Sequence, residues 1–189
     1  QAVWDKSINN PGWEKMAHVK FIAQSSNSGT WKRLKEMPDQ WNISYELGKH
    51  ILNFRLGLTA FKHIGVFPEQ AVNWDFIYES VKNLKTSEPK ILNLFAYTGG
   101  SSLAASAAGA TVTHVDSVKQ VVNWAKDNAK GSKLENIRWI VDDAVKFAER
   151  MGELNPGHKY SLPTEAQLEV AFRGGTKTAY VTRRDDDVG

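Results

Sequence analysis

Apolar residues recur along the second half of the chain in short runs, each followed by a stretch with helical spacing. The runs suit buried strands, and the stretches after them place apolar residues on one face of a helix. Strands are predicted at residues 90–95, 111–115 and 137–141, and helices at 101–108, 118–130 and 143–151. Strands and helices that alternate at this spacing predict an α/β fold with a parallel, doubly wound sheet.

The first part of the chain carries a different pattern. Residues 41–45 and 51–56 alternate apolar and polar positions, and Gly48 lies between them, so a β-hairpin is predicted. A short helix is predicted over residues 13–22, and a longer helix over residues 69–85. The residues expected on the buried face of the longer helix are Val72, Phe76, Ile77, Val81 and Leu84.

The alternation breaks at Asn155-Pro156-Gly157. Beyond it the sequence offers only a short helical stretch at 164–172 and a β-prone stretch at 178–182. We therefore expect a partial Rossmann-like sheet with a small β-rich region before it and an irregular segment after it. The predicted regions are an N-terminal β-rich region (1–60), a Rossmann-like cofactor-binding half (61–152) and a divergent C-terminal segment (153–189).

Composition limits the function classes. The 189 residues suffice for one domain and a small appendage, and 41% hydrophobic with 24% charged residues is typical of a soluble globular protein. The net charge of +3 is compatible with nucleic-acid binding. No apolar run approaches the roughly 18 residues of a membrane span. The chain starts with Gln1 and shows no signal-peptide pattern, so a fragment of a longer protein is expected.

The chain has no cysteine, which excludes disulfides, thiolate metal ligands and a cysteine nucleophile. This absence favours a reducing compartment, so a cytoplasmic location is expected. The five histidines lack metal-ligand spacing, and we expect no metal.

Candidate chemistry lies at the predicted strand ends. Gly99 and Gly100 follow the first strand, where backbone can approach a ligand closely. Asp116 ends the second strand, where a carboxylate can accept hydrogen bonds from both ribose hydroxyls. Asp142 or Asp143 ends the third strand, within reach of an adenine amino group. Together these features indicate an adenosine-containing cofactor; the alternative is that the glycines form a tight turn and the acids cap helices.

The glycine pattern narrows the choice of cofactor. Ser101-Ser102 follow Gly99-Gly100, so the G-x-G-x-x-G pattern of a pyrophosphate-binding turn is absent. A nicotinamide dehydrogenase is therefore disfavoured. A cofactor without phosphates is favoured, and S-adenosyl-L-methionine is the obvious one.

Longer stretches resemble one enzyme family. "NLFAYTGGS" (93–101) resembles the first motif of class I methyltransferases of the large-subunit ribosomal RNA cytosine-C5 type, and "FKHIGVFPEQAVNWDFI" (61–77) resembles the segment before that motif. "HVDSVKQVVNWAKDNA" and "IRWIVDDAVKF" resemble its second and third strand motifs. The resemblance covers about residues 1–150. It implies an S-adenosyl-L-methionine-dependent enzyme whose expected substrate is RNA, specifically ribosomal RNA.

The same resemblance implies site residues. Those expected around the methionine part of the cofactor are Phe95, Tyr97, Thr98, Gly99 and Ser101. Asp116 is expected to bind the ribose, Asp143 with Ala144 to recognise adenine, and Gln70 with Asn73 to flank the pocket.

The sequence also departs from that family. Its substrate-positioning motif, an Asp or Asn followed by Pro-Pro after a fourth strand, occurs nowhere in the chain, and the cysteine nucleophile is missing. No catalytic residue can be named, so cofactor binding without efficient turnover is expected. The first strand would then lie at an open sheet edge, for which residues 178–183 are a candidate partner.

The C-terminal segment resembles another family. "LPTEA" (162–166) and "RGG" (173–175) are similar to a signature of formylglycine-generating-enzyme-like domains, which have a C-type-lectin-related fold. About 40 residues carry this likeness. A non-catalytic binding module with a lectin-like C-terminal segment is therefore the alternative interpretation.

Overall fold

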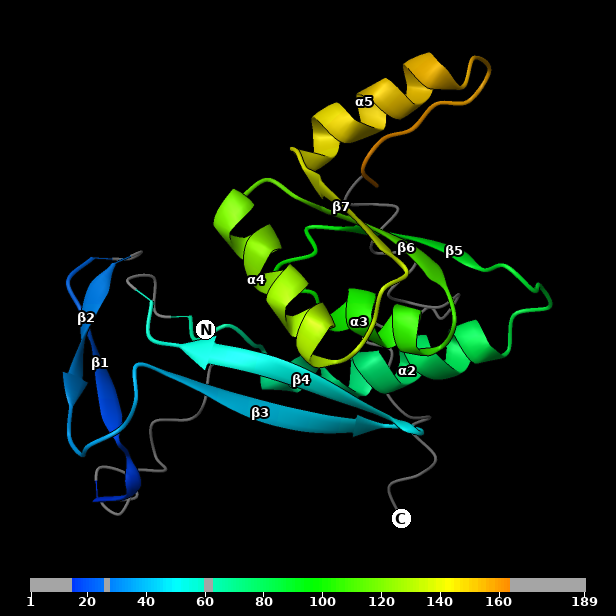
Figure 1. Cartoon of the computed structure of the whole chain (residues 1–189). Coiled ribbons are helices and arrows are strands. Elements are labelled where there is room, and N and C mark those ends of the chain that lie inside the picture. Colours follow the sequence, from blue (N-terminus) through cyan, green and yellow to red (C-terminus); the bar gives the residue numbers. More distant parts are fainter. Residues whose placement is uncertain (1–14, 26–27, 60–62, 164–189) are drawn as a thin grey trace, which may run out of the picture. The chain divides into compact units, whose positions relative to one another are not determined.

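The computed structural model describes residues 15–25, 28–59 and 63–163 (Figure 1). The chain divides into two compact units, residues 1–141 and 142–189. The helix expected at 164–172 and the strand expected at 178–183 lie outside the described residues. The division into regions 1–60, 61–152 and 153–189 stays a prediction.

After two helical residues, Lys15 and Met16, the described chain forms a short antiparallel hairpin. Its strands are β1 (Val19–Ala23) and β2 (Gly29–Arg33). Phe21 lies opposite Trp31, and the two rings meet edge to face with centroids 5.0 Å apart. The helix predicted at 13–22 is therefore wrong over residues 19–22. Cross-strand aromatic packing and β-branched residues outweighed the weak helical spacing there.

The predicted second hairpin is confirmed. Strands β3 (Gln40–Leu47) and β4 (His50–Gly57) pair antiparallel along their whole length. Gly48 opens the tight turn with φ 57°, a left-handed conformation that suits glycine in a two-residue hairpin loop. One face of β4 is buried through Leu52, Phe54 and Leu56.

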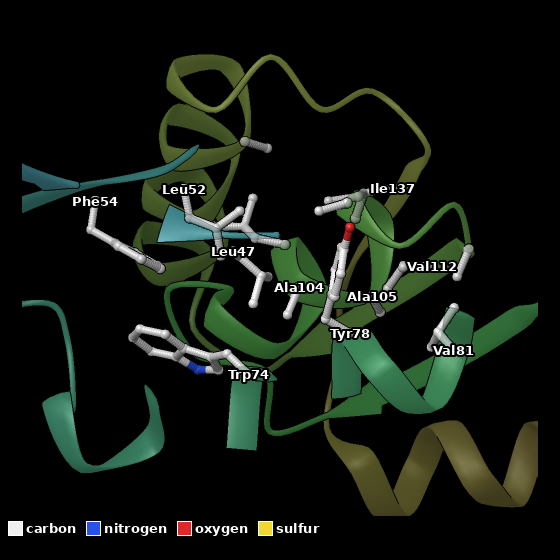
Figure 2. Packing of buried hydrophobic residues seen from close by; sticks show 14 of the residues in the cluster. Leu47, Leu52, Phe54, Trp74, Tyr78, Val81, Ala104, Ala105, Val112 and Ile137 are labelled. Atoms are coloured by element: carbon white, nitrogen blue, oxygen red, sulfur yellow. The ribbon is translucent and has the colours of Figure 1, made fainter. Parts of the chain in front are cut away.

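The predicted long helix forms as η1 (Pro68–Gln70) and α2 (Ala71–Lys82). Its buried face was predicted only in part: Val81 is buried and Ile77 packs against the core, but the other predicted residues are exposed. Val72 and Phe76 are each 70% exposed. The residues buried on α2 are Trp74, Tyr78 and Val81. The large rings of Trp74 and Tyr78 reach the core, where Trp74 stacks on Phe54 with ring centroids 4.9 Å apart (Figure 2).

The parallel sheet is confirmed, and the fold is α/β and Rossmann-like. Its strands are β5 (Lys90–Leu94), β6 (Thr111–Asp116) and β7 (Ile137–Val141), in the order β5-β6-β7. The crossover helices are α3 (Gly100–Ala107) and α4 (Lys119–Gly131). Within the described residues, β5 pairs only with β6 and forms one edge of the sheet.

Small side chains on α3 let α2 pack closely against it. Ala104 and Ala105 are fully buried beside Trp74 and Tyr78 (Figure 2). At Gly100 an added Cβ would lie 2.6 Å from Nε1 of Trp74, so the first residue of α3 has no room for a side chain. This contact fixes the turn that precedes α3 against α2.

The second unit begins with helix α5 (Ala144–Leu154). Asp143 caps it: Oδ1 accepts hydrogen bonds from the backbone nitrogens of Val145 (2.9 Å) and Lys146 (3.2 Å). Arg150 forms a salt bridge with Asp142. Residues 155–163 contain no helix or strand. None of the helices in the described part of the chain is both long and apolar enough to cross a membrane.

Candidate functional site

The turn between β5 and α3 has an unusual backbone. Phe95 (φ 53°), Tyr97 (φ 49°) and Gly99 (φ 95°) all lie in the left-handed region. Glycine adopts that region easily, whereas two bulky aromatic residues there are outliers of the kind that cluster at functional sites. An added Cβ at Gly99 would lie 3.2 Å from Cβ of Ala125, so the turn also packs tightly on α4.

Hydrogen bonds from three other segments hold this turn in place. The backbone nitrogen of Tyr97 donates to Oδ2 of Asp116 at 2.9 Å. The Thr98 hydroxyl donates to the carbonyl oxygen of Gly65 at 2.7 Å, and the Asn128 amide donates to the carbonyl oxygen of Thr98 at 2.9 Å. The strained conformation is therefore fixed by its surroundings.

Asp116 joins the ends of β5 and β6. While Oδ2 accepts from Tyr97, Oδ1 accepts from the backbone nitrogen of Val118 at 3.0 Å. A carboxylate has about four lone-pair sites, so two further hydrogen bonds can still be accepted. The side chain is only partly buried, and a ligand with two neighbouring hydroxyls fits this capacity.

A pocket of about 370 Å³ opens beside the turn. This volume lies within the ordinary range of small-molecule sites. Its lining includes the predicted residues Gln70, Phe95, Tyr97, Thr98 and Ser101. Asn93 at the end of β5 also lines it, and Phe54 with Trp74 contribute apolar surface.

Aromatic rings gather around Tyr97. The Phe67 and Tyr97 ring centroids are 5.2 Å apart, and His63 lies 5.2 Å from Phe67 and 6.5 Å from Tyr97. Burial raises the pKa of the Tyr97 phenol; a hydrogen bond with the Gly65 backbone opposes this rise in part, and the Asp116 carboxylate adds to it. The phenol is therefore neutral at physiological pH and can donate a hydrogen bond.

A polar network that the sequence analysis missed lies beside the pocket. Nδ2 of Asn93 donates to Oγ of Ser102 at 2.9 Å, and that hydroxyl contacts Nδ1 of His114 at 3.0 Å. His114 is fully buried, and burial lowers its pKa to about 4, so the ring is neutral. The only sequence signal was polar residues inside apolar strands. With its amide nitrogen occupied, Asn93 keeps its carbonyl oxygen available to a ligand.

Three predicted residues of the first unit, Asn73, Gly99 and Asp116, do not line the pocket. Asp116 acts beside it through Tyr97, and Gly99 shapes the turn. Asn73 donates from Nδ2 to Oε1 of Gln70 at 2.8 Å, and so orients a pocket residue. Asp143 belongs to the second unit.

Ala144 follows Asp143 in the second unit and is buried. The adenine-recognition role of Asp143 and Ala144 stays a prediction. Across the residues that the structure describes, no three His, Cys, Asp or Glu side chains are grouped so that they could hold a metal ion.

Known proteins match the part of the chain that carries this site. The ribosomal RNA large subunit methyltransferase K/L of Pseudoalteromonas atlantica is 35% identical over 134 residues, which is 70% of this chain. The protein of the same name from Shewanella amazonensis is 40% identical over 77 residues, or 40% of this chain. The crystal structure of the SAM-dependent methyltransferase from Agrobacterium tumefaciens is 40% identical, with a TM-score of 0.69 over 79% of this chain.

The chain is similar to SAM-dependent methyltransferases in both sequence and fold. The resemblance stated for residues 1–150 is thereby confirmed at the level of large-subunit ribosomal RNA methyltransferases. The relatives' names give neither a base nor an atom, so the cytosine-C5 type stays a prediction. The chain spans 18% and 10% of the lengths of the two K/L relatives and 46% of the Agrobacterium chain.

A second likeness concerns the C-terminal part. The family model described as Sulfatase-modifying factor enzyme 1-like domain matches residues 98–188. This confirms the resemblance of the C-terminal segment, and the match begins earlier than the signature at 162–175 suggested. It overlaps α3, β6, α4, β7 and α5.

Proposed function

We propose that this chain is the S-adenosyl-L-methionine-binding portion of a methyltransferase that acts on RNA. The observation that carries the proposal is the strained turn after β5, tied by Asp116 to the end of β6 beside a pocket of about 370 Å³. The names of the K/L relatives support ribosomal RNA as the substrate class. We place the activity in the cytoplasm, in line with a chain that lacks cysteine.

The charge of the pocket lining supports a phosphate-free cofactor. Among the described residues, the lining holds the carboxylate of Glu69 and no lysine or arginine. A pyrophosphate would lack a cationic partner there, whereas S-adenosyl-L-methionine carries a positively charged sulfonium and an ammonium group. The residues present therefore fit this cofactor, which when bound would supply the methyl group.

Each part of the cofactor has a candidate partner in the proposal. The Asp116 carboxylate accepts hydrogen bonds from the ribose hydroxyls. The Asn93 carbonyl oxygen, held by Ser102, accepts from the ammonium group, and Ser101 and Gln70 contact the methionine part. Phe95, Tyr97, Thr98 and Gly99 shape the turn against it, and Asp143 with Ala144 recognise adenine.

The chain contributes to methyl transfer by positioning the cofactor and by excluding water. We assign no general base and no nucleophile. Because the Pro-Pro motif expected after a fourth strand does not occur in the sequence, the proposal is cofactor binding without efficient turnover.

Isothermal titration of the full chain with S-adenosylhomocysteine tests the function. We expect saturable binding to S-adenosylhomocysteine and none to NAD⁺ or ATP at the same concentrations, because both carry phosphates that the pocket cannot neutralise. Tighter binding of NAD⁺ would instead support a nicotinamide enzyme.

A non-catalytic binding module is the second candidate, favoured by the family-model match over residues 98–188. In that case the C-terminal segment would form the binding surface. The same titration separates the two candidates, because a binding module of this kind would give no heat with S-adenosylhomocysteine.

A further inference from the structure

A groove of about 400 Å³ lies between the C-terminal part of α4 and strand β7, within the first unit. We call it the lysine groove. Its lining residues include Lys126, Lys130, Lys133, Leu134, Glu135 and Trp139. It is lined by other residues than the cofactor pocket.

Lys126 and Lys130 share one side of α4 because they are four residues apart on the helix. Lys133 follows the end of α4 and lines the same groove. Like charges at this spacing destabilise a helix. In the described part of the chain none of the three forms a salt bridge, although Glu135 lines the same groove. The positive charge of the groove is therefore largely uncompensated.

Lys133 holds a backbone conformation that is unfavourable for a lysine. Its φ is 57°, at the position after the end of α4 where glycine is usual. The nitrogens of Lys133 and Leu134 donate to the carbonyl oxygens of Lys130 (3.1 Å) and Ala129 (3.0 Å). Helix α3 ends in the same hydrogen-bond pattern, but there the equivalent residue is Gly109.

Apolar surface lies beside these ammonium groups. Leu134 and the indole of Trp139 line the groove, and both side chains are only partly buried. Trp139 packs on the ring of His114, with ring centroids 4.7 Å apart, and keeps part of its surface open to the groove. Amino groups next to a partly exposed ring match a strand of RNA, in which phosphates alternate with bases that stack on aromatic side chains. An acidic peptide would use the lysines but gain little from the ring.

We propose that the lysine groove binds single-stranded RNA, with Lys126, Lys130 and Lys133 on consecutive phosphates and a base against Trp139. This inference rests on the proposed function, which makes RNA the substrate. It adds a second contact between enzyme and RNA, separate from the pocket where the methyl group would be transferred.

Fluorescence anisotropy with a labelled single-stranded oligoribonucleotide tests the proposal, using the full chain over a range of salt concentrations. Each phosphate contact to a single strand contributes about 0.7 to the slope of log affinity against log salt concentration. The triple variant Lys126→Gln/Lys130→Gln/Lys133→Gly should therefore lower that slope by about 2 and weaken binding at low salt. The matched control Lys82→Gln/Lys85→Gln/Lys90→Gln should keep the wild-type slope.

Three outcomes overturn the proposal. The first is an unchanged slope in the triple variant. The second is an equal loss in the control variant, which would indicate general electrostatic attraction. The third is competition by polyglutamate as effective as competition by unlabelled RNA. Titration of both triple variants with S-adenosylhomocysteine should match the wild type, so failure of cofactor binding is recognised separately from failure of the groove.

Discussion

The single side chain of Asp116 combines a structural role with a proposed ligand contact. It fixes the backbone of Tyr97 and Val118, and it keeps lone pairs that a ribose could use. Asp116 does not cap α4, whose N-cap residue is Val118 and which has no side-chain cap hydrogen bond, so the helix-capping alternative does not account for this carboxylate. Among the described residues, the hydrogen bonds of the Asp143 side chain are the two that cap α5.

The buried imidazole of His114 should make the stability of the protein depend on pH. Its pKa is about 4 in the folded chain and about 6.5 when unfolded, so between these values the unfolded chain binds more protons. The free energy of unfolding should therefore fall as the pH falls from 7 to 5, by about 2 kcal/mol. Urea unfolding at the two pH values measures this. In the His114→Gln variant this difference should shrink, whatever its absolute stability.

Lys133 and Gly109 form a matched pair of left-handed residues. Lys133→Gly should raise the free energy of unfolding by about 1 kcal/mol, because the lysine side chain disfavours its backbone conformation. Gly109→Ala should lower the free energy of unfolding by a similar amount, because Gly109 has φ 100°. No other atom lies within 4 Å of an added Cβ there, so this loss would come from the backbone conformation and not from a steric clash. Chemical denaturation of both variants measures the changes. A loss of stability in Lys133→Gly would contradict the backbone argument.

Helices α2 and α3 pack closely against each other, and Gly100 is a point of tight contact, because an added Cβ there would lie 2.6 Å from Nε1 of Trp74. Gly100→Ala should lower the free energy of unfolding by about 1–3 kcal/mol, because the new methyl group would overlap the indole of Trp74. Thermal unfolding measures the loss. In the Trp74→Phe background the same substitution should cost less, since the smaller ring leaves space; an equal cost in both backgrounds would show that the contact is not the cause.

The elements were predictable where local pattern and tertiary packing agree. The three strand–helix units and the 41–56 hairpin follow from periodicity and turn residues, and the structure has them. On the buried face of α2, Val81 was predicted in this way, whereas Trp74 and Tyr78 were not. Their burial depends on contacts with Phe54 and the alanines of α3, which are distant in the sequence.

The candidate site, too, could be predicted from the sequence only in part. Its glycine turn and Asp116 could be named from sequence because the strand ends had to meet. The hydrogen bonds from Asn93 through Ser102 to His114 join three elements. This network could not be predicted from sequence, because no residue spacing indicates which polar side chains meet in the fold.

At the scale of the whole molecule, the described chain combines a cofactor-sized pocket with an open sheet edge at β5. Its relatives are much longer, and it matches only 46% of the Agrobacterium methyltransferase. In the proposed function this chain supplies cofactor binding and an RNA contact, while a group for substrate positioning is not identified in it. Cofactor binding is therefore the central property of the proposed function.

The most direct measurement is calorimetric titration of S-adenosylhomocysteine into wild type, Asp116→Asn and the control Asp127→Asn. Asp127 is an exposed acid that forms a salt bridge with Arg55 at 3.3 Å. We predict that Asp116→Asn weakens binding by about tenfold or more, because charged hydrogen bonds to the ribose are lost, while thermal unfolding shows a folded protein. Asp127→Asn should bind like the wild type. Equal affinity in all three proteins, or no binding by the wild type, would contradict the account.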